Sequence, residues 1–388
     1  MQINKKRAIR FLQKLIQENT VNPPGNELSV AKIIKEHSQN NNLNAELKQV
    51  TNNRSNIIIQ LPGESLNSAP LVFSGHLDTV PVGEIDNWSV NPFSGECKNG
   101  KIYGRGACDM KSGVAALIEA MIYMKENNII PKEDIIFVGT VGEEVDCLGA
   151  RQVIKDNLIT NAGAMIIAEP SDNKVLSAHK GALWLEIEIF GETAHGATPE
   201  EGVNAIKSMI NILEKIEKAN FLTKFEHSLL GKPSFNLSKI EGGVQTNVVP
   251  DYCKSSIDIR TIPPMKHNKI IEQIKYLLQE EEANGCRAHI KILQNLMPLS
   301  NKENSAYVDL ALHINNHLQE KKNHKTGAAS YYTDGSIFSN DLDIPIIIYG
   351  PGDAKLAHQA NEYVSIENYI NSIHYYSLMA QSYTKSII

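Results

Sequence analysis

The sequence predicts an α/β fold: a mixed-sheet α/β domain with helices on both faces, interrupted by an inserted ferredoxin-like α+β domain. Three observations lead to this prediction. Continuous apolar runs alternate with helical patterns in the first half, alternating apolar and polar residues follow from about residue 178, and a continuous apolar run returns at 345–349. Continuous runs are typical of strands covered on both faces, whereas alternation is typical of a sheet with one wet face.

The first twenty residues begin with basic side chains but contain no long apolar stretch. Phe11, Leu12, Leu15 and Ile16 recur at helical spacing with polar residues between them, which indicates an amphipathic helix and not a signal peptide. No run in the chain approaches the roughly 20 apolar residues of a membrane span. We therefore expect a cytoplasmic protein that does not bind membranes.

Four short apolar runs in the first half are predicted strands of the core, at residues 57–59, 71–73, 135–140 and 165–168. Residues 112–125 form a helical pattern, because apolar residues recur there at spacings of three and four. Buried strands that alternate with helices indicate a sheet covered on both faces.

The region from about residue 178 has a different pattern, which begins with strict alternation over 183–189. Apolar stripes predict helices over 203–218 and 266–282. Further strands are expected at 235–237, 256–259 and 288–293. The resulting β-α-β-β-α-β order is the ferredoxin-like arrangement.

The length of 388 residues exceeds that of a typical single domain, so two domains are expected. We assign residues 1–177 and 295–388 to a core domain and residues 178–294 to an inserted domain.

The composition excludes several classes of protein. The hydrophobic content of 42% and the charged content of 21% are ordinary for a globular protein. The net charge is −6 and the basic residues are scattered, so we expect no nucleic-acid partner. The five cysteines form no Cys-x-x-Cys pair and are odd in number, which argues against a disulfide framework or a structural zinc ribbon.

The heptapeptide GHLDTVP, residues 75–81, follows an apolar run that looks like a strand entering the core. On a strand, His76 and Asp78 at spacing i, i+2 would share one face. Burying an imidazole beside a carboxylate is costly unless both groups are satisfied. Two interpretations remain open from these residues alone: a hydrogen-bonded pair that closes a strand end, or a metal-binding histidine oriented by a carboxylate.

Further acidic and histidine residues follow predicted core strands or open a helix. They are Asp109 in GRGACDMKSG, Glu143 and Glu144 in VGEEVDCLGAR, Glu169 in AEPS, and His358 in GPGDAKLAHQANEY. Each has an ordinary alternative, such as a helix N-cap for Asp109 or a solvated loop for the two glutamates. Open α/β sheets place their sites beyond the carboxyl ends of the strands, so we expect these side chains to meet at one sheet edge.

Together these residues predict a metal centre. Two histidines and three carboxylates suit two borderline divalent ions with one bridging carboxylate, and zinc accepts both donor types. No cysteine stands at these points, which favours a hydrolytic site over a structural one. The five candidate ligands are His76, Asp109, Glu144, Glu169 and His358.

The motifs as a series resemble the di-zinc amidohydrolase and metallopeptidase family. That family contains acetylornithine deacetylase, succinyl-diaminopimelate desuccinylase, aminoacylase and the glutamate-type carboxypeptidases. The likeness covers about residues 5–385, with the motifs in the family's order. They are GHLDTVP, GRGACDMKSG, VGEEVDCLGAR, AEPS, HGATPEEGVNA, GGVQTNVVPDYCKSSIDIR and AHQANEY.

The resemblance implies a role for each metal-site residue. His76 and Glu169 would hold one zinc, and Glu144 and His358 would hold the other. Asp109 would bridge the two ions and be followed by a cis peptide. The cofactor would be two Zn²⁺ per chain, with Co²⁺ or Mn²⁺ as alternatives.

Two further carboxylates would act without holding metal. Asp78 would accept the other ring N–H of His76 and fix its orientation. Glu143 would be the general base that takes a proton from water and returns it to the leaving amine.

The inserted domain would then act as a lid and a dimerisation domain. His195 resembles the family histidine that reaches a neighbouring subunit's active site, although a surface loop histidine is the simpler alternative. Arg260 would grip the substrate carboxylate with Asn247 assisting, and a sheet-edge ion pair is the alternative for Arg260. Gly352 would lie in a tight turn where backbone approaches the ligand. A homodimer is expected through the inserted domain.

The predicted activity is hydrolysis of the amide bond of N-acyl amino acids, of the deacetylase or desuccinylase type found in amino-acid biosynthesis. Glu169 and AHQANEY resemble the N-acyl amino acid deacylases. However, Ser336-Ile337-Phe338 replaces the arginine-phenylalanine part of the desuccinylase pattern, so the acyl group stays open. The alternative is a metallo-dipeptidase or carboxypeptidase with the same site. A binding protein without activity is disfavoured, because Glu143 and every candidate ligand are present.

Overall fold

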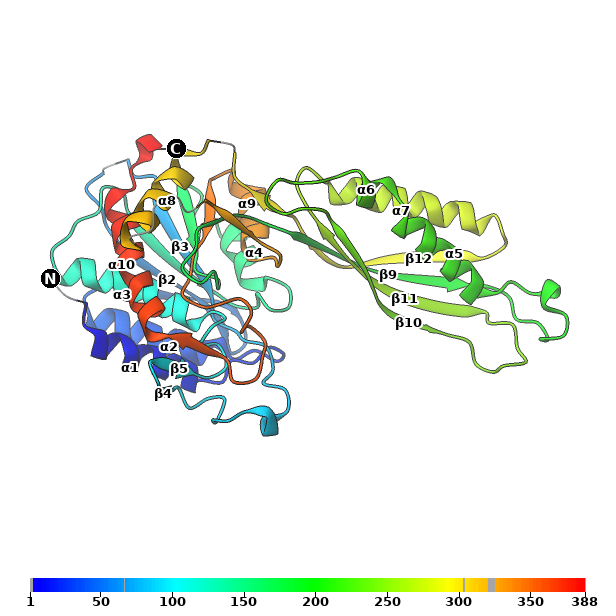
Figure 1. The fold of residues 1–388 in the computed structure, drawn as a ribbon, viewed down its shortest axis with the longest axis horizontal. Helices are drawn as coiled ribbons and strands as arrows, with labels where there is room; N and C mark the ends of the chain where they lie inside the picture. The colour runs from blue at the N-terminus through cyan, green and yellow to red at the C-terminus, as the bar shows by residue number, and fades with distance from the viewer. Residues whose placement is uncertain (1–2, 66, 303, 320–324, 388) are drawn as a thin grey trace. The chain divides into compact units, whose positions relative to one another are not determined.

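The computed structural model describes residues 3–65, 67–302, 304–319 and 325–387 (Figure 1). The chain forms two compact units. The first comprises Met1–Ala178, Ser300–Ala328 and Thr333–Ile388, and the second comprises His179–Leu299 and Ala329–Tyr332. The predicted domain limits, after residues 177 and 294, stay predictions.

A large mixed sheet organises the first unit, with strand order β1-β2-β6-β3-β7-β15-β8-β13 and with β14 beside β8. Neighbours from β6 to β15 are parallel, whereas β1, β2 and β8 pair antiparallel, which confirms the predicted mixed sheet. The strands are β1 (Asn44–Thr51), β2 (Arg54–Leu61), β3 (Leu71–His76), β6 (Ile135–Thr140), β7 (Ala164–Ile167), β8 (Leu176–His179), β13 (Leu299–Ser300), β14 (Gly327–Ala329) and β15 (Ile346–Ile348).

Helices cover both faces of this sheet. The chain moves from β3 to β6 in one direction and from β6 back past β3 to β7 in the other. Right-handed crossovers therefore place α3 and α4 on opposite faces. Every residue of β3, β6 and β7 is buried, as continuous apolar strands require. The helices are α1 (Lys5–Gln17), α2 (Glu27–Asn40), α3 (Lys111–Glu126), α4 (Leu148–Lys155), α8 (Ala306–Leu318), α9 (Gly335–Leu342) and α10 (Ile366–Ser382).

A small second sheet of the first unit was not expected from the sequence. Its order is β16-β5-β4, formed by β4 (Glu96–Lys98), β5 (Lys101–Tyr103) and β16 (Tyr363–Ser365). Strands of three residues are too short to show a periodic pattern. This sheet joins the segment before Asp109 to the segment after His358.

The second unit has the predicted β-α-β-β-α-β order, with a short extra helix, α6 (Asn220–Thr223). Its antiparallel sheet has the order β10-β11-β9-β12. The buried residues of β9 alternate and are Leu183, Leu185, Ile187 and Ile189, which accounts for the one-faced pattern of the sequence. The other elements are β9 (Gly181–Phe190), α5 (Ala205–Glu217), β10 (Ser234–Gly242), β11 (Tyr252–Thr261), α7 (His267–Glu282) and β12 (Arg287–Leu296).

Among the described residues, no helix has both the length and the apolar character needed to cross a bilayer. All five cysteines are free thiols, and four of them are buried.

Glu119 of α3 is a buried carboxylate that joins three helices of the first unit. Its Oε2 accepts hydrogen bonds from Arg7 of α1 at 3.0 and 2.9 Å, and its Oε1 lies 2.8 Å from His37 Nε2 of α2. The His37 ring also stacks on Phe11 at a centroid distance of 3.8 Å. Because Glu119 is fully buried, removing its charge would leave His37 without this carboxylate partner and Arg7 with only the half-exposed Glu126.

We expect Glu119→Gln to lower the free energy of unfolding by about 3–5 kcal/mol, measured by urea denaturation. Glu126→Gln is the matched control, because Glu126 pairs with the same Arg7 but is half exposed. Exposed pairs contribute about 0.2–1 kcal/mol, so the control should lose less. Equal losses in the two variants would contradict the role given to Glu119.

Candidate metal centre

Adjacent parallel strands bring most of the predicted site residues to one sheet edge. His76 is the last residue of β3, Glu143 and Glu144 lie in the turn after β6, and Glu169 follows β7. His358 lies in a turn beyond β15 and has a left-handed backbone with φ of 65°. The carboxyl ends of these strands share one edge, which is where α/β sheets hold their sites.

Asp109 reaches the same place by another route, because it lies in the turn that precedes α3 rather than after a strand of the large sheet. The Asp109–Met110 peptide is cis, as the resemblance implies.

The two carboxylate oxygens of Asp109 face two different histidines. Oδ1 lies 3.2 Å from His76 Nε2, and that nitrogen lies 3.6 Å from Glu169 Oε1. Oδ2 lies 3.3 Å from His358 Nε2, and that nitrogen lies 3.3 Å from Glu144 Oε2. The five candidate ligands therefore form two sets of three that share Asp109.

These separations suit the ligands of a small divalent cation. Donor atoms about 2.0–2.2 Å from a tetrahedral zinc ion lie about 3.4 Å from one another. Imidazole nitrogen and carboxylate oxygen are both donors that zinc accepts.

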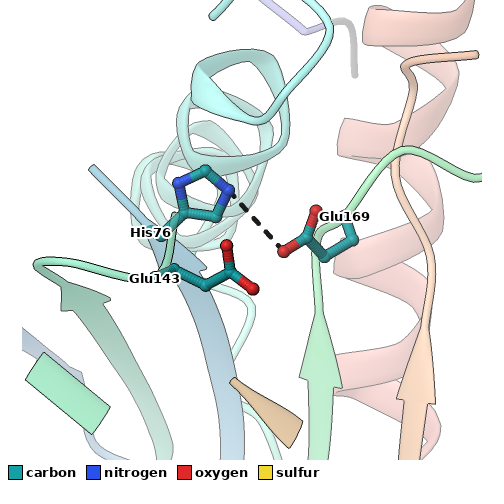
Figure 2. Close-up of side chains that lie close together, drawn as sticks. All are labelled: His76, Glu143 and Glu169. Atoms are coloured by element: carbon teal, nitrogen blue, oxygen red, sulfur yellow. Dashed lines mark ion pairs between the residues drawn. The ribbon is translucent and has the colours of Figure 1, made fainter. Parts of the chain in front are cut away.

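Glu143 lies beside the first set. Figure 2 shows its carboxylate next to His76 and Glu169, and donor atoms of these three buried side chains lie within 4.8 Å of one another. By distance alone, Glu143 could be a metal ligand in that set. Distance therefore does not distinguish a ligand role of Glu143 from a role as general base.

The site as a whole favours positive charge. Burial raises the pKa of Glu143 and of Glu169 well above the usual range, and neighbouring carboxylates add to the shift. Burial alone would lower the pKa of His76, but the charges of Glu169 and Asp109 raise it well above its usual value. Hydrogen bonds to its two carboxylate neighbours raise the pKa of His358 to about 10. Divalent cations would supply the charge that this group favours.

Two buried basic residues near Asp109 in the sequence bind partners other than the candidate ligands. Lys111 Nζ donates to two carbonyl oxygens at the C-terminal end of α1, at 2.9 and 2.7 Å. Arg105 Nη1 donates to Glu362 at 2.5 Å.

Glu144 Oε1 is buried and has no hydrogen-bond partner in the described part of the chain. The donor set, its spacing and this unpartnered oxygen fit a centre of two divalent cations.

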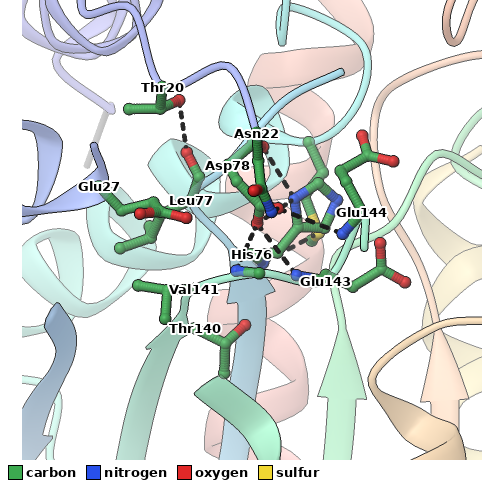
Figure 3. A network of polar contacts seen from close by, with 12 residues as sticks. Thr20, Asn22, Glu27, His76, Leu77, Asp78, Thr140, Val141, Glu143 and Glu144 are labelled. Atoms are coloured by element: carbon green, nitrogen blue, oxygen red, sulfur yellow. Dashed lines mark hydrogen bonds and ion pairs between the residues drawn. The ribbon is translucent and has the colours of Figure 1, made fainter. Parts of the chain in front are cut away.

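Asp78 organises the turn that carries both glutamates (Figure 3). Its Oδ1 accepts the backbone N–H groups of Gly142 and Glu143 at 3.0 and 3.1 Å, and its Oδ2 accepts that of Glu144 at 3.2 Å. Asn22 Nδ2 donates to the same Oδ2 at 2.9 Å. A fully buried carboxylate thus meets four donors, which offsets its desolvation.

The contact between Asp78 and His76 differs from the prediction. β3 ends at His76, so Asp78 lies beyond the strand and not on a shared strand face. His76 Nδ1 lies 3.0 Å from the backbone oxygen of Asp78 but 3.6 Å from its carboxylate. The backbone oxygen is therefore the acceptor that directs Nε2 toward Asp109, because the carboxylate is engaged by the turn.

The second unit places its predicted residues at two separate ends of the sheet. His195 and Asn247 lie close together, because His195 forms a β-bridge with Val248 and Gly196 N donates to Asn247 O at 2.8 Å. Both residues are exposed. Both follow the ends of their strands, beyond Phe190 in β9 and beyond Gly242 in β10.

Arg260 lies at the other end of the same sheet, where it pairs with Ala182 at the start of β9. The eight residue steps from Ala182 to Phe190 span about 26 Å. Asn247 and Arg260 of one chain therefore lie toward opposite ends of this sheet, and the assistance of Arg260 by Asn247 stays a prediction.

Gly352 is explained by a close approach between backbone segments. A Cβ at this position would lie 2.6 Å from the backbone oxygen of Cys108 and 2.7 Å from its Sγ. The turn therefore packs on the residue before Asp109. Contact of Gly352 with substrate stays a prediction.

Sequence reasoning missed three residues that support the candidate site. Asn22 donates to Asp78, and Glu362 accepts hydrogen bonds from Arg105 and from the backbone N–H of Asp109. Glu362 stands in AHQANEY, four residues after His358, so its place in a motif was the available signal. Asn22 and Arg105 carry no periodic or spacing signal, because their partners are distant in the chain.

The sequence model of peptidase family M20/M25/M40 matches residues 72–382. A probable succinyl-diaminopimelate desuccinylase of Staphylococcus aureus is 28% identical over 98% of this chain and 98% of its own.

Two solved structures share the fold. A tripeptidase from Staphylococcus aureus has a TM-score of 0.81 and 24% identity, over 98% of this chain and 99% of that chain. A dinuclear metal-binding peptidase of family M20 from Bacillus subtilis has a TM-score of 0.75 and 15% identity, over 97% of both chains. The predicted fold class is confirmed by these similarities.

We expect Asp78→Asn to lower the free energy of unfolding by about 2–4 kcal/mol, because an amide N–H would face buried backbone donors. The measurement is urea denaturation with a chelator present, so that bound metal does not contribute. Asp134→Asn is the control, since Asp134 accepts one backbone N–H, that of Gly63, at 2.8 Å. A loss no greater than that of the control would contradict the organising role of Asp78.

Proposed function

Because the chain belongs to peptidase family M20/M25/M40, we propose that it is a di-zinc hydrolase that cleaves the amide bond of N-acyl amino acids. The family matches the one that the sequence motifs resemble, so that prediction is confirmed. Membership in this family makes the chain a metal-dependent amidohydrolase. One observation supports two metal ions: each carboxylate oxygen of Asp109 faces a different histidine. The similarity to a probable desuccinylase supports an N-acyl amino acid as the substrate.

The proposed ligands divide into two sets. His76 and Glu169 would hold one zinc ion, Glu144 and His358 would hold the other, and Asp109 would contact both. When bound, two such cations lower the pKa of water and polarise an amide carbonyl. Cobalt or manganese would suit the same oxygen and nitrogen donors.

Glu143 is the proposed general base. It is buried beside the candidate ligands, and burial with negative neighbours makes its carboxylate a stronger base than a free glutamate. It would take a proton from the attacking water and pass it to the amine nitrogen as the C–N bond breaks. Water and the amide are thereby converted to a carboxylic acid and a free amine.

Arg260 is the proposed partner of the substrate's α-carboxylate. Its Nε pairs with Asp258 at 3.0 Å, and its guanidinium lies 6.0 Å from the Trp184 ring and 5.7 Å from the Tyr332 ring. Within the described residues, no hydrogen bond engages its Nη1 or Nη2. A guanidinium held by its inner nitrogen presents both outer nitrogens to a carboxylate.

His195 and Asn247 are proposed to act on the metal centre of a second copy in a homodimer. Their distance from Arg260 along the sheet excludes contact with the same small substrate in one chain. A small molecule gripped by Arg260 would therefore meet them only on a neighbouring chain.

The edge of the second unit's sheet supports such a dimer. β10 is one of the two edge strands and exposes Leu237 and Ile240, and the adjoining Val244 is 82% exposed. An unpaired apolar strand edge favours pairing with another chain.

The alternative is a metallopeptidase that acts on short peptides, as the tripeptidase with the same fold does by its name. Arg260 suits the free carboxylate of either substrate. The two substrate classes differ in the acyl part, which carries a free α-amino group in a peptide and none in an N-acetyl, N-succinyl or N-formyl amino acid.

The deciding experiment is hydrolysis by the zinc-loaded protein of a panel of N-acetyl, N-succinyl and N-formyl amino acids and of dipeptides. We expect kcat/KM for at least one N-acyl amino acid to exceed that for every dipeptide. Faster cleavage of dipeptides would replace the proposed function with the alternative.

Glu143→Gln serves as the control for this panel. It should lower kcat by about 100-fold or more, because a positioned general base contributes that much, while bound zinc stays at the wild-type level. Loss of zinc in this variant would make Glu143 a ligand instead of a base.

We expect Arg260→Ala to raise KM by about tenfold to a hundredfold for substrates with a free α-carboxylate, equal to about 1.4–2.7 kcal/mol of binding. The corresponding amides, which lack that charge, should be affected little. Arg287→Ala is the control, because Arg287 is an exposed arginine of the same sheet. An unchanged KM would dismiss the role of Arg260.

Mixed oligomers test the roles of His195 and the dimer together. We expect His195→Ala and Glu143→Gln to be inactive alone and to recover activity when co-assembled, because one site would then hold intact residues from both chains. Light scattering should show a dimer. No recovery in a mixed dimer would contradict action on the neighbouring chain.

A further inference from the structure

We propose that the buried ion pair of Glu362 and Arg105 positions three chain segments that carry candidate ligands, those of His76, Asp109 and His358. By holding these segments, the pair would set the affinity for zinc. This inference rests on the proposed two-metal function. Neither residue faces the candidate ligands as a donor, and both act through backbone groups of the loops that carry them.

Glu362 holds the backbone of Asp109 directly. Its Oε1 accepts the N–H groups of Cys108 and Asp109 at 2.7 and 3.0 Å, and its Oε2 accepts Arg105 Nη1 at 2.5 Å. The Glu362 side chain is fully buried. Rotation of the Asp109 backbone would break one of these contacts, so the direction of the shared carboxylate depends on Glu362.

Arg105 extends the contact to the loop of His358 and to the segment that follows His76. Its Nη1 also donates to the backbone oxygen of Gln359, next to His358, at 3.3 Å. Its Nη2 donates to the backbone oxygen of Pro81, at the end of the segment that begins with His76, at 3.1 Å. Its guanidinium lies 5.3 Å from the Trp88 ring.

The small sheet holds the two partners in register. β5 and β16 pair Tyr103 with Tyr363, and Gly104 N donates to Glu362 O at 2.9 Å. Glu362 and Arg105 are thus presented from adjacent strand ends. The pair thus joins the segment that follows His76, the turn of Asp109 and the turn of His358. His76 belongs to the first ligand set, His358 belongs to the second, and Asp109 is shared.

A gain in folding stability does not by itself explain a buried ion pair at this position, because burying two charges costs free energy. Replacing a buried ion pair by apolar residues is often neutral or stabilising. Residues that orient ligands from behind commonly change metal affinity by about 10–100-fold when they are altered. We therefore assign to the pair the role of orienting the candidate ligands.

The test measures zinc affinity of the full chain by competition with a chromophoric chelator, with thermal unfolding recorded in parallel. We expect Glu362→Gln to weaken at least one zinc site by about 10–100-fold. Arg105→Lys keeps the charge but cannot reach Glu362, Gln359 and Pro81 together, so it should weaken zinc binding too. It also keeps the test valid if Glu362→Gln does not fold.

Glu133→Gln is the matched control. Glu133 is a buried glutamate that likewise accepts two backbone N–H groups, those of Ala69 and Lys385 at 3.1 and 2.9 Å, but it does not contact the candidate ligands. It should lower the unfolding temperature and leave both zinc affinities at the wild-type level.

Two outcomes would overturn the inference while leaving the proposed function intact. They are wild-type zinc affinity in both Glu362→Gln and Arg105→Lys, or an equal loss of affinity in Glu133→Gln. Binding of fewer than two zinc ions by the wild type would instead overturn the proposed function and this inference with it.

Discussion

The shared carboxylate of Asp109 is the contact on which the rest of the site depends. Its two oxygens face the two histidines separately, at 3.2 Å from His76 and 3.3 Å from His358. Buried carboxylates on either side raise one another's pKa, so the arrangement favours concentrated positive charge. Two divalent cations would satisfy that requirement, and the proposed hydrolytic chemistry rests on them.

The fold supplies this contact by combining two devices. Parallel strands of the large sheet deliver His76, the glutamate turn and Glu169 to one edge. The small sheet brings Asp109 and the His358 segment together from positions more distant in the chain. Two buried carboxylates then fix the loops by accepting backbone N–H groups: Asp78 behind the glutamate turn and Glu362 behind Asp109. Each offsets its desolvation with several donors.

Much of this was predictable from sequence, and the limits have physical causes. Continuous apolar runs located β3, β6, β7 and β15, and residues at or after the ends of such strands converge, which predicted four of the five candidate ligands. Asp109, which opens α3, was predicted from its motif. The strands of the small sheet were too short to leave a pattern. The acceptor of His76 could not be predicted, because a backbone oxygen is present at every residue and only the fold selects one. The separation of Asn247 from Arg260 within one chain could not be predicted, because sequence proximity does not reveal that β11 runs back along the whole sheet.

Anomalous X-ray diffraction from crystals grown with zinc, recorded above and below the zinc absorption edge, tests the central claim most directly. The account predicts two peaks that share the carboxylate of Asp109, one beside His76 and Glu169 and the other beside Glu144 and His358. A single peak, or zinc bound away from Asp109, would contradict it.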